Sequence, residues 1–538
     1  MGRWRDAPHE PTLAVIAQLT TQAARLRRGR VALWLAVAVG IAAALGVRAY
    51  HIDQPPIGGF AAPRQYHGAH LARWYYVKTQ DAVSEWKKQV ARRNADDEGI
   101  VGDPPVMEFA AATAYRVVGG EQLWIPRLLA SLWWLAGGAF LYLIARRLAP
   151  AAGALCSLGV YLFLPFAVSA SRSFQPDPMV VALLLAGVLA VLRYHEEPGL
   201  QRLWIAAAVS ALAVLAKPGV ALFPLLGAFV GLSVAGQGMR RTVRDRRLWA
   251  FVALVVSPAA FYLLWGIVLD DFLRGATGGR IVPGLLDEPS FWRGWGNVLM
   301  RVLGATLLAA ALVGIVLARG RGRGFLVGLW AGYVLYGLAF TYHIHTHEYY
   351  SLQLVPIAAL SLAPLVAVVL TGLRRLWLRR RAVVVAGAAV GAVVVGLDVV
   401  QAYERLTNEP VVKDRVAAYE AIGRDVRHSR RTIILDYSYG APVKYHGWFS
   451  GAYWPTSSDI FTPAVGEPQI SARERFRRYW PDGSLAEGSP EYFVVTDLAD
   501  LDRQRDLRRL LRRSSVVRRT QEYVVYDVRS LWKTTGPG

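Results

Sequence analysis

Cysteine is almost absent from this sequence, and its absence narrows the chemistry. The 538 residues include a single cysteine, Cys156, which lies in an apolar segment. Disulfide bonds within the chain and cysteine-based metal sites are therefore excluded. A small-residue cleavage site is also missing after the first apolar run. We therefore expect the N-terminal segment to be a retained signal anchor rather than a signal peptide that is removed.

Acidic residues are scarce as well. There are 39 aspartates and glutamates against 61 lysines and arginines, which gives a net charge of +22. Such an excess could serve nucleic-acid binding, but the arginines stand in short clusters between apolar runs. Hydrophobic residues make up 54% of the chain, above the roughly 45–50% that is usual in soluble proteins. This pattern is typical of a multi-pass membrane protein and disfavours a nucleic-acid partner.

Apolar runs of about the length that crosses a bilayer recur through the first 400 residues. Residues 203–235 could form one tilted span, but a hairpin of two short helices is favoured, because Lys217, Pro218 and Gly219 interrupt the run and both of its ends are basic. The sequence thus predicts a polytopic α-helical protein with about eleven spans. These spans are residues 31–49, 124–145, 151–169, 178–193, two within 203–235, 249–269, 298–318, 325–341, 352–372 and 382–400.

The arginine clusters also predict how the chain is oriented in the membrane. Loops with arginine clusters alternate with loops that hold acids, histidines and aromatics, and basic loops stay on the cytoplasmic side. We expect a cytoplasmic lead (residues 1–30) and a transmembrane domain (31–400) whose external loop (50–122) carries amphipathic helices. An external soluble domain (401–538) follows. The protein should lie in the plasma or inner membrane.

The soluble domain is predicted to be a small α/β unit. No apolar run beyond residue 400 is long enough to span a bilayer. Strand patterns at 432–437, 492–496 and 523–528 alternate with helical patterns at 411–427 and 500–512. Alternation of this kind indicates helices packed on a sheet.

Candidate chemistry begins in the external loop. Asp53 follows the first span by a few residues, where a carboxylate at the outer membrane surface suits a general base; an ordinary interfacial acid is the alternative. Arg64 lies on an expected helix over residues 63–78, and a cation at the outer face often meets a phosphate. Asp103 precedes two prolines that stiffen its turn, although it could simply cap the next helix.

Later external segments add further candidates. Arg172 and Asp177 lie in one short hairpin, where Asp177 could instead cap the following helix. Lys217 lies at the external end of its own hairpin, where it could snorkel or contact a phosphate. His343, His345 and His347 alternate in a way that is compatible with metal ligation, but no cysteine is near. Binding of a phosphate or a sugar hydroxyl by one histidine is the favoured interpretation.

These residues share one property: the arginine-based topology puts them all on the external face. The set comprises Asp53, Arg64, Asp103, Arg172, Asp177, Lys217, His347 and Tyr350. Their convergence predicts a site for an anionic, partly lipidic substrate that is reached from the bilayer.

The order of these features resembles the GT-C membrane glycosyltransferases, in particular the lipid-carrier-dependent group that includes protein O-mannosyltransferases and the lipid A aminoarabinose transferase. The resemblance covers about residues 30–370. It is carried by Asp53 and by the segments RQYHGAHLARWYY, DPPVMEFAAATAYRVVGGEQLWIPRLLASL, SRSFQPDPM, AKPGVALFPLL and HEYYSLQLVPIAAL. Two features depart from the group: Gln54 follows Asp53 where relatives often have a second acid, and Gly102 and Asp103 replace a Glu-Lys pair.

The resemblance implies a polyprenyl-phosphate-linked sugar as donor and transfer to an acceptor hydroxyl on the external face. It implies Asp53 as catalytic base, Asp103 near a metal or the donor phosphate, and Asp177 near the sugar. A single displacement would invert the anomeric centre. A departing phosphate needs cations, so we assign the donor phosphate to Arg64, Lys217 and Arg172.

The remaining assignments concern the sugar, the acceptor and the cofactor. Side chains expected to contact the sugar or the acceptor are Asp177, His345, His347, Tyr349, Tyr350 and Glu108. A divalent metal ion is allowed at Asp103, and no nucleotide cofactor is expected. The expected partners are the lipid-linked sugar, an acceptor lipid, glycan or protein, and membrane lipids.

Two other functions compete with this interpretation. Charges in broken helices also mark transport paths, so a transporter or flippase of a lipid-linked sugar is one alternative. The charge-free interiors of most spans disfavour it. A non-catalytic envelope scaffold, with the C-terminal domain as its binding part, is the other.

Overall fold

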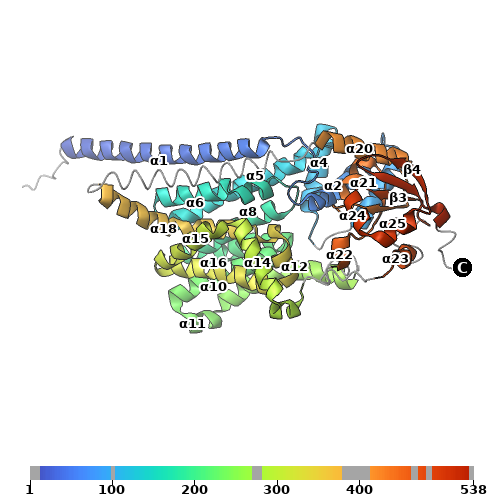
Figure 1. Cartoon of the computed structure of the whole chain (residues 1–538). Helices are drawn as coiled ribbons and strands as arrows, with labels where there is room; N and C mark the ends of the chain where they lie inside the picture. Colours follow the sequence, from blue (N-terminus) through green and yellow to red (C-terminus); the bar gives the residue numbers. More distant parts are fainter. Residues whose placement is uncertain are drawn as a thin grey trace, which may run out of the picture.

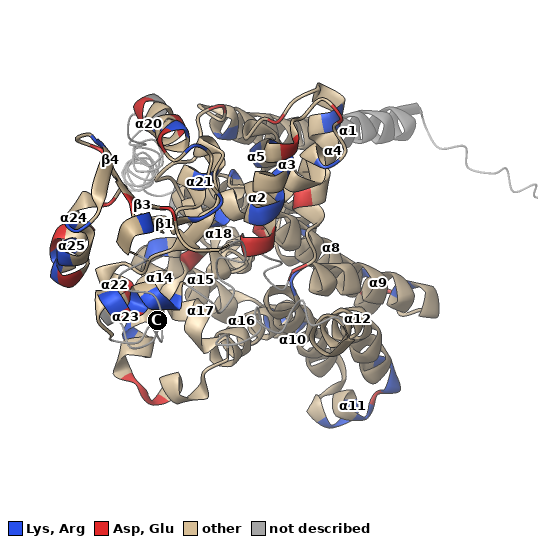
Figure 2. Cartoon of the chain, turned by 90° about the vertical axis from the view of Figure 1, so that its right-hand side faces the viewer, with Lys and Arg blue, Asp and Glu red and all other residues tan. Residues whose placement is uncertain are grey.

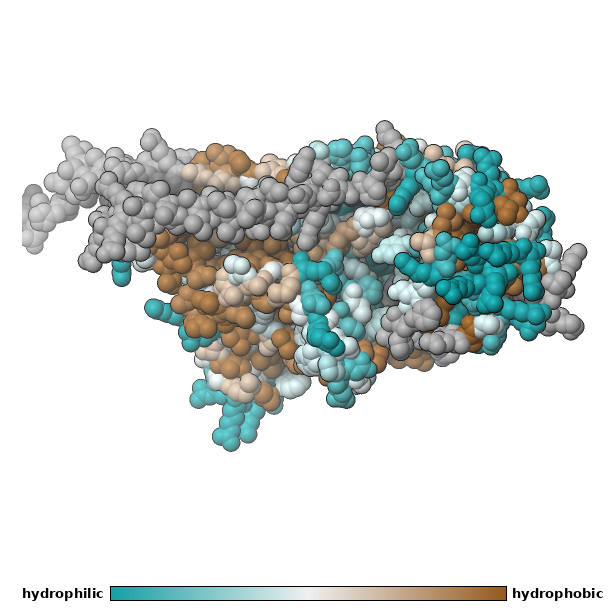
Figure 3. All heavy atoms as spheres, in the orientation of Figure 1, coloured by the Kyte–Doolittle hydropathy of each residue, from teal (hydrophilic) through white to brown (hydrophobic). Residues whose placement is uncertain are grey.

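The computed structural model describes residues 13–98, 103–269, 281–377, 412–461, 470–479 and 488–531. A long bundle of helices leads into a small domain with a sheet, and the helices of the first loop lie where the two parts meet (Figure 1). On the face shown in Figure 3, apolar residues dominate the described part of the bundle, whereas hydrophilic residues dominate the small domain. The division of surface chemistry matches that of a membrane-embedded part and a soluble part.

The bundle consists of helices that follow the apolar runs of the sequence. In chain order they are α1 (Leu13–Ala49), α5 (Trp124–Leu148), α6 (Ala151–Phe163), α7 (Pro165–Ser171), α8 (Asp177–Glu196), α9 (Leu200–Ala216), α10 (Pro218–Gln237), α11 (Met239–Arg244), α12 (Arg246–Leu264), η1 (Trp265–Leu269), η2 (Pro283–Asp287), α14 (Pro289–Val302), α15 (Gly304–Leu317), α16 (Gly320–Ala339), α17 (Thr341–Thr346), η3 (Glu348–Ser351) and α18 (Leu354–Trp377). The first loop adds α2 (Ala62–Val77), α3 (Glu85–Glu98) and α4 (Val106–Val118).

The chain is a polytopic helical membrane protein, as predicted, but the number of spans differs. Among the described residues, six helices are long and apolar enough to cross a membrane, or up to eight if two bent pairs each count as one span. The predicted spans at 151–169 and 298–318 are these pairs, bent by 57° and 90°. The other differences from eleven arise at α9, which has only 17 residues, at α16, which starts with an arginine-glycine run, and at 382–400, outside the described residues.

Residues 203–235 form two helices, as the interruption at Lys217 predicts. Lys217 has an extended backbone between α9 and α10, and Pro218 occupies the first turn of α10. Further along, α10 packs very closely on α16. A Cβ atom at Gly227 would lie 2.1 Å from the carbonyl oxygen of Gly328. Small residues at such positions let two helix backbones touch, so α10 is held closely against α16.

The small domain has a five-stranded sheet of order β2-β1-β3-β5-β4. Its strands are β1 (Thr432–Leu435), β2 (Gly451–Tyr453), β3 (Tyr492–Val495), β4 (Ser515–Arg519) and β5 (Val524–Asp527). β1 is parallel to β2 and β3, whereas β5 is antiparallel to β3 and β4. The strands predicted at 432–437, 492–496 and 523–528 are thus confirmed, and so is the α/β class.

Helices cover both faces of this sheet. They are α20 (Val412–Asp425), α21 (Ala441–Gly447), α22 (Ser457–Phe461), α23 (Ala472–Arg478), α24 (Leu498–Arg503) and α25 (Arg505–Leu511). Ile434 packs in one cluster with side chains of α20 and α21, whereas Ile433 packs with α23 and α25 in the other. Seen from the end of the soluble domain, charged residues gather on α24 and α25 at its edge (Figure 2).

Arg73 on α2 joins the first loop to the soluble domain. Its Nε lies 3.0 Å from both carboxylate oxygens of Glu121, and its Nη1 donates to the Tyr445 carbonyl at 2.6 Å. The guanidinium also lies 3.5 Å from the centre of the Tyr445 ring and 4.0 Å from that of Trp448. Arg73 is therefore a structural cation, buried at the junction of α2 and α21.

Two further contacts fix α2 on the same surface. The Tyr66 hydroxyl lies 2.7 Å from Nε2 of His446, and Nε2 of His70 lies 3.0 Å from the Ala441 carbonyl. Much of the segment RQYHGAHLARWYY therefore serves to seat α2. Arg64, on the first turns of the same helix, is left to face a pocket.

Candidate functional site

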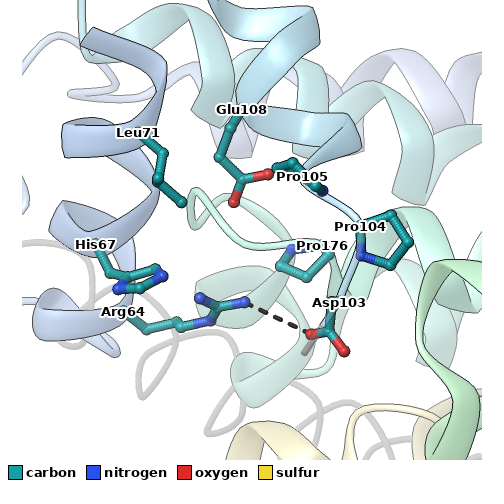
Figure 4. Close-up of a pocket in the computed structure, with 8 residues that line it drawn as sticks. All are labelled: Arg64, His67, Leu71, Asp103, Pro104, Pro105, Glu108 and Pro176. Carbon is teal, nitrogen blue, oxygen red and sulfur yellow. Dashed lines mark ion pairs between the residues drawn. The ribbon is translucent and has the colours of Figure 1, made fainter. Parts of the chain in front are cut away.

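Arg64 and Asp103 face each other in a narrow pocket between α2, α4 and the start of α8 (Figure 4). Nη2 of Arg64 lies 3.7 Å from Oδ2 of Asp103, and the two side chains are 15% and 10% exposed. The other lining residues are His67, Leu71, Pro104, Pro105, Glu108 and Pro176. The cavity volume is about 10 Å³, which is room for about one water molecule.

Asp103 does not cap the following helix. The N-cap position of α4 is occupied by Pro105, and no side chain caps it. The alternative of a simple capping aspartate is therefore not what the structure has. Instead, the prolines end the turn and Asp103 faces Arg64.

The charges of this pocket influence one another. Burial acts to lower the pKa of Arg64, but the nearby carboxylates of Asp103 and Glu108 outweigh it, and its pKa is raised. Burial raises the pKa of Glu108, against the opposing effect of Arg64. Glu108 packs closely against α2 at Gly68, where a Cβ would lie 3.3 Å from Oε1 of Glu108.

Lys217 and Asp177 form a second, deeper ion pair. Nζ of Lys217 donates to Oδ1 of Asp177 at 2.7 Å, and their side chains are only 6% and 1% exposed. The other oxygen of Asp177 is buried and has no hydrogen-bond partner among the described residues. Pro176, next to Asp177, also lines the Arg64 pocket. One short segment, Pro176–Asp177, therefore contributes both to the Arg64 pocket and to the second ion pair.

The segment after α17 connects the two pairs. Nζ of Lys217 lies 4.5 Å from the centre of the Tyr350 ring and 5.8 Å from that of Tyr349. Both tyrosine hydroxyls also influence Arg64 electrostatically. His347 is also close to Lys217. Burial lowers the pKa of His347, and the charges of His345 and Lys217 lower it further. Tyr349, Tyr350 and His347 thus belong to the cluster of Arg64 and Lys217.

Three predicted site residues lie outside this cluster. Asp53 is exposed, and its side chain makes no hydrogen bond or ion pair with the described part of the chain. Nη2 of Arg172 donates to the Tyr50 carbonyl at 2.7 Å. Nδ1 of His345 lies 2.7 Å from the Thr341 carbonyl, so this ring is used locally.

Arg127 was not among the predicted site residues, yet it holds the turn that carries Asp53. Its Nη1 donates to the carbonyls of Ile52 and Gln54 at 2.8 and 2.5 Å. With Arg172 on the Tyr50 carbonyl, two buried guanidinium groups fix the backbone on both sides of Asp53. Arg127 could have been singled out as a charge within a predicted span. His67 and Leu71 were also missed, and their spacing from Arg64 along one helix was the available signal.

The residues around Asp103 do not match a divalent metal site as they stand. Although His67, Asp103 and Glu108 line one pocket, no group of three or more histidine, cysteine, aspartate or glutamate side chains within the described ranges is placed to hold a metal ion. The partner of Asp103 in the pocket is a cation, Arg64. Carboxylate and water ligands suit hard divalent ions, but a guanidinium group does not.

One segment of the chain matches a known protein family. Residues 102–265 match the family model described as dolichyl-phosphate-mannose-protein mannosyltransferase. This segment runs from the turn of Asp103 to the end of α12 and includes both Asp177 and Lys217. The resemblance to GT-C membrane glycosyltransferases that the sequence indicates is thereby confirmed. No curated protein matches the chain by sequence.

Among solved structures, the chain is similar to ArnT from Cupriavidus metallidurans. The apo crystal structure has 16% identity and a TM-score of 0.54, over 93% of this chain and 99% of that chain. The structure of ArnT bound to undecaprenyl phosphate has 14% identity and a TM-score of 0.51, with the same coverage of 93% and 99%. The similarity shows an ArnT-like fold along almost the whole chain.

A third structure is more distant. It is the Archaeoglobus fulgidus oligosaccharyltransferase in complex with Zn and sulfate, with 11% identity and a TM-score of 0.48, over 86% of this chain and 68% of that chain. A likeness at this level carries no conclusion about the present chain.

Proposed function

We propose that this protein transfers a sugar from a polyprenyl-phosphate carrier to an acceptor hydroxyl at the external face of the membrane. One observation carries the proposal. Arg64 and Lys217, two cations paired with Asp103 and Asp177, meet around Tyr349 and Tyr350 where the helix bundle joins the soluble domain. The ArnT-like fold supports it, since ArnT was crystallised bound to undecaprenyl phosphate.

The donor phosphate would bind between the two cations. A polyprenyl phosphate leaves as an anion, so cations stabilise the transition state more than a general acid does. Each cation is held by a carboxylate, and an incoming phosphate would compete with Asp103 for Arg64 and with Asp177 for Lys217. Arg64 is the more accessible of the two and would bind the phosphate directly. Lys217 would stabilise the leaving oxygen.

Asp53 would act as the general base. The acceptor oxygen forms a bond to the anomeric carbon, the bond from that carbon to the phosphate oxygen breaks, and the acceptor proton passes to Asp53. The polyprenyl phosphate takes the bonding electron pair, and the configuration inverts. Arg127 and Arg172 hold the carbonyls around Asp53, so we assign them to the positioning of this base. Arg172 would then not bind the donor phosphate, in contrast to its assignment from the sequence.

The remaining side chains would recognise the sugar or the acceptor. Asp177 has one carboxylate oxygen that could accept a hydrogen bond from a sugar hydroxyl. Tyr349, Tyr350, His347 and Glu108, which lie near Arg64 or Lys217, would contribute further contacts, whereas His345 would support the segment through Thr341. No step is assigned to a metal ion, since the residues around Asp103 do not form a ligand set.

The topology proposed from the sequence fits this scheme. Residues 1–30 would lie in the cytoplasm, and the first loop and residues 401–538 would lie outside. The donor would then approach from the outer leaflet, and the acceptor from the external space.

Reconstitution tests the reaction. The full chain is placed in liposomes with a panel of undecaprenyl-phosphate-linked sugars, and transfer to lipid, glycan and peptide acceptors is measured by mass spectrometry. We expect transfer by the wild type and its loss in Asp53→Asn, with undecaprenyl phosphate binding unchanged. Asp81→Asn, an exposed acid of the same loop, is the matched control and should keep full activity.

The outcomes separate the competing functions. Activity that persists in Asp53→Asn would remove the base assignment alone. Passage of the lipid-linked sugar to the opposite leaflet without transfer would favour a flippase. Binding of acceptors without either process would favour a scaffold.

A further inference from the structure

The soluble domain contains a second cavity, away from the pocket of Arg64 and Asp103. Its volume is about 500 Å³, within the range of about 300–1,000 Å³ that is usual for small-molecule sites. Its lining includes Arg415, Tyr419, Asp436, Thr496, Asp497 and Glu522. None of these residues belongs to the proposed transfer site.

The position of the cavity follows from the topology of the sheet. β1 lies between β2 and β3, and the connections that flank β2 pass on opposite faces, through α21 on one and α23 on the other. The chain therefore diverges at the carboxyl ends of β1 and β3. Ligands of parallel sheets commonly bind in the crevice at such a switch point. Asp436 follows β1 directly, and Thr496 follows β3.

Asp436 forms the rigid floor of this crevice. Its Oδ1 accepts a hydrogen bond from the Thr496 hydroxyl at 2.5 Å, which ties the ends of the two strands together. Its Oδ2 accepts from the backbone N–H groups of Ser438 and Gly440 at 2.8 and 3.1 Å. Asp436 is therefore fully engaged. The groups available to a ligand are those around it.

Tyr419 on α20 supplies one of these groups. Its side chain is 8% exposed, yet its hydroxyl makes no hydrogen bond within the described residues and is not among the polar atoms that protein encloses completely. The ring lies in the electrostatic range of Asp436, Arg415 and Glu522. Tyr419 lines the cavity, so a ligand bound there could provide the hydrogen-bond partner that its hydroxyl lacks among the described residues.

The rim supplies the others. Gln521 and Glu522, in the turn between β4 and β5, are exposed and make no side-chain hydrogen bond with described residues. Tyr437 is 82% exposed. The lining holds three carboxylates, from Asp436, Asp497 and Glu522, against the single guanidinium of Arg415, so its charge disfavours phosphates and other anions.

We propose that this cavity binds a neutral oligosaccharide. Carboxylate, amide and phenol oxygens accept or exchange hydrogen bonds with sugar hydroxyls, and tyrosine rings offer flat apolar faces to the C–H faces of a sugar ring. The volume, the acidic lining and the unpaired Tyr419 hydroxyl agree with such a ligand. The proposal does not rest on the transfer reaction. It would hold for a protein that only binds glycans.

The experiment uses the full chain in lipid nanodiscs, free of sugar-based detergent. Maltotriose, mannotriose and chitotriose are the probes, with saturation-transfer NMR to detect binding and titration calorimetry to measure Kd. We expect at least one trisaccharide to bind. Tyr419→Phe and Glu522→Gln should each weaken it about 2- to 10-fold, the usual effect of losing one hydrogen bond.

Glu420→Gln, at an exposed neighbouring position on α20, is the matched control and should leave Kd unchanged. Glu522 is itself exposed, so Glu522→Gln keeps the test valid if Tyr419→Phe perturbs folding. The proposal is overturned if no trisaccharide binds, or if Tyr419→Phe and Glu522→Gln leave Kd unchanged. It is also overturned if inorganic phosphate or a trilysine peptide binds there in place of the sugars.

Discussion

Nζ of Lys217 and Oδ1 of Asp177 form an ion pair of 2.7 Å, with both side chains almost completely buried. Lys217 stands where α9 ends and α10 begins, and Asp177 is the first residue of α8. Two buried charges of opposite sign, each at the end of a helix, hold three helices together at the level of the proposed site.

Removing one partner of this pair should destabilise the protein strongly. Lys217→Ala and Asp177→Asn are each expected to lower the free energy of unfolding by about 3–5 kcal/mol, because an uncompensated polar group or charge stays buried. The double variant Lys217→Met/Asp177→Leu should regain stability without regaining transfer. Thermal unfolding in nanodiscs and the transfer assay measure the two effects. Full stability in either single variant would contradict the buried pair.

Arg64 and Asp103 should respond differently from each other. Arg64→Ala is expected to weaken undecaprenyl phosphate binding about tenfold or more, because a charge-assisted contact to phosphate is lost. Asp103→Asn should leave this binding intact, since it removes only the group that competes for Arg64. Calorimetric titration checks both. The contrary result has two parts. Asp103→Asn abolishes binding, and the wild type loses binding on chelation of divalent metal and regains it when the metal is added back. Asp103 would then be a metal ligand.

Arg73 should matter for stability and not for the chemistry of transfer. Arg73→Lys keeps the charge but loses the planar group that reaches Glu121 and lies against Tyr445 and Trp448. We expect a loss of roughly 1–3 kcal/mol, since hydrogen bonds to a charged group and a cation–π contact are both weakened. Arg92→Lys is the control, because the Arg92 side chain is 69% exposed. Equal melting temperatures for the two variants would argue against a structural role of Arg73.

His446 should make stability depend on pH. Burial, with Arg73 acting in the same direction, lowers the pKa of His446 to about 3 from 6.5. The unfolded chain takes up a proton below its higher pKa while the folded chain does not. The contribution of neutral His446 to the free energy of unfolding is therefore complete above the pKa of the unfolded chain and is lost as the pH falls toward 3.

The loss should amount to about 1.4 kcal/mol per pH unit within that window. On going from about pH 7.5 to about pH 5, the melting temperature of the wild type should fall more than that of His446→Gln. His51→Gln, at an exposed position in the first loop, serves as the control. Identical pH profiles for wild type and His446→Gln would show that His446 is accessible to protons in the folded state.

The sequence was most informative where structure depends on local composition. Apolar runs predicted the bundle, and short β-rich runs such as 432–437 predicted strands of the sheet. Hydropathy, however, does not indicate where a helix bends. Residues 298–318 therefore read as one span, although the chain bends by 90° between Pro289–Val302 and Gly304–Leu317.

The site was predictable as a set of residues but not as a set of contacts. Arginine placement put Arg64, Asp103, Asp177 and Lys217 on one face, yet nothing in the sequence indicates which acid pairs with which cation. Those pairings depend on how helices far apart in the chain pack. Arg172 shows the same limit, because its loop position resembles that of a phosphate ligand while its guanidinium satisfies the Tyr50 carbonyl.

The seat of α2 on the soluble domain has a mechanical consequence. Arg64 lies on a helix that Tyr66, His70 and Arg73 fasten to α21, whereas Lys217 belongs to helices of the bundle. The distance between the two cations thus depends on how the C-terminal domain packs on the helix bundle. A ligand that binds both cations would connect the helix bundle to the C-terminal domain. A small tilt of the domain would change the distance between Arg64 and Lys217, and with it the affinity for such a ligand, without altering any residue in the pocket.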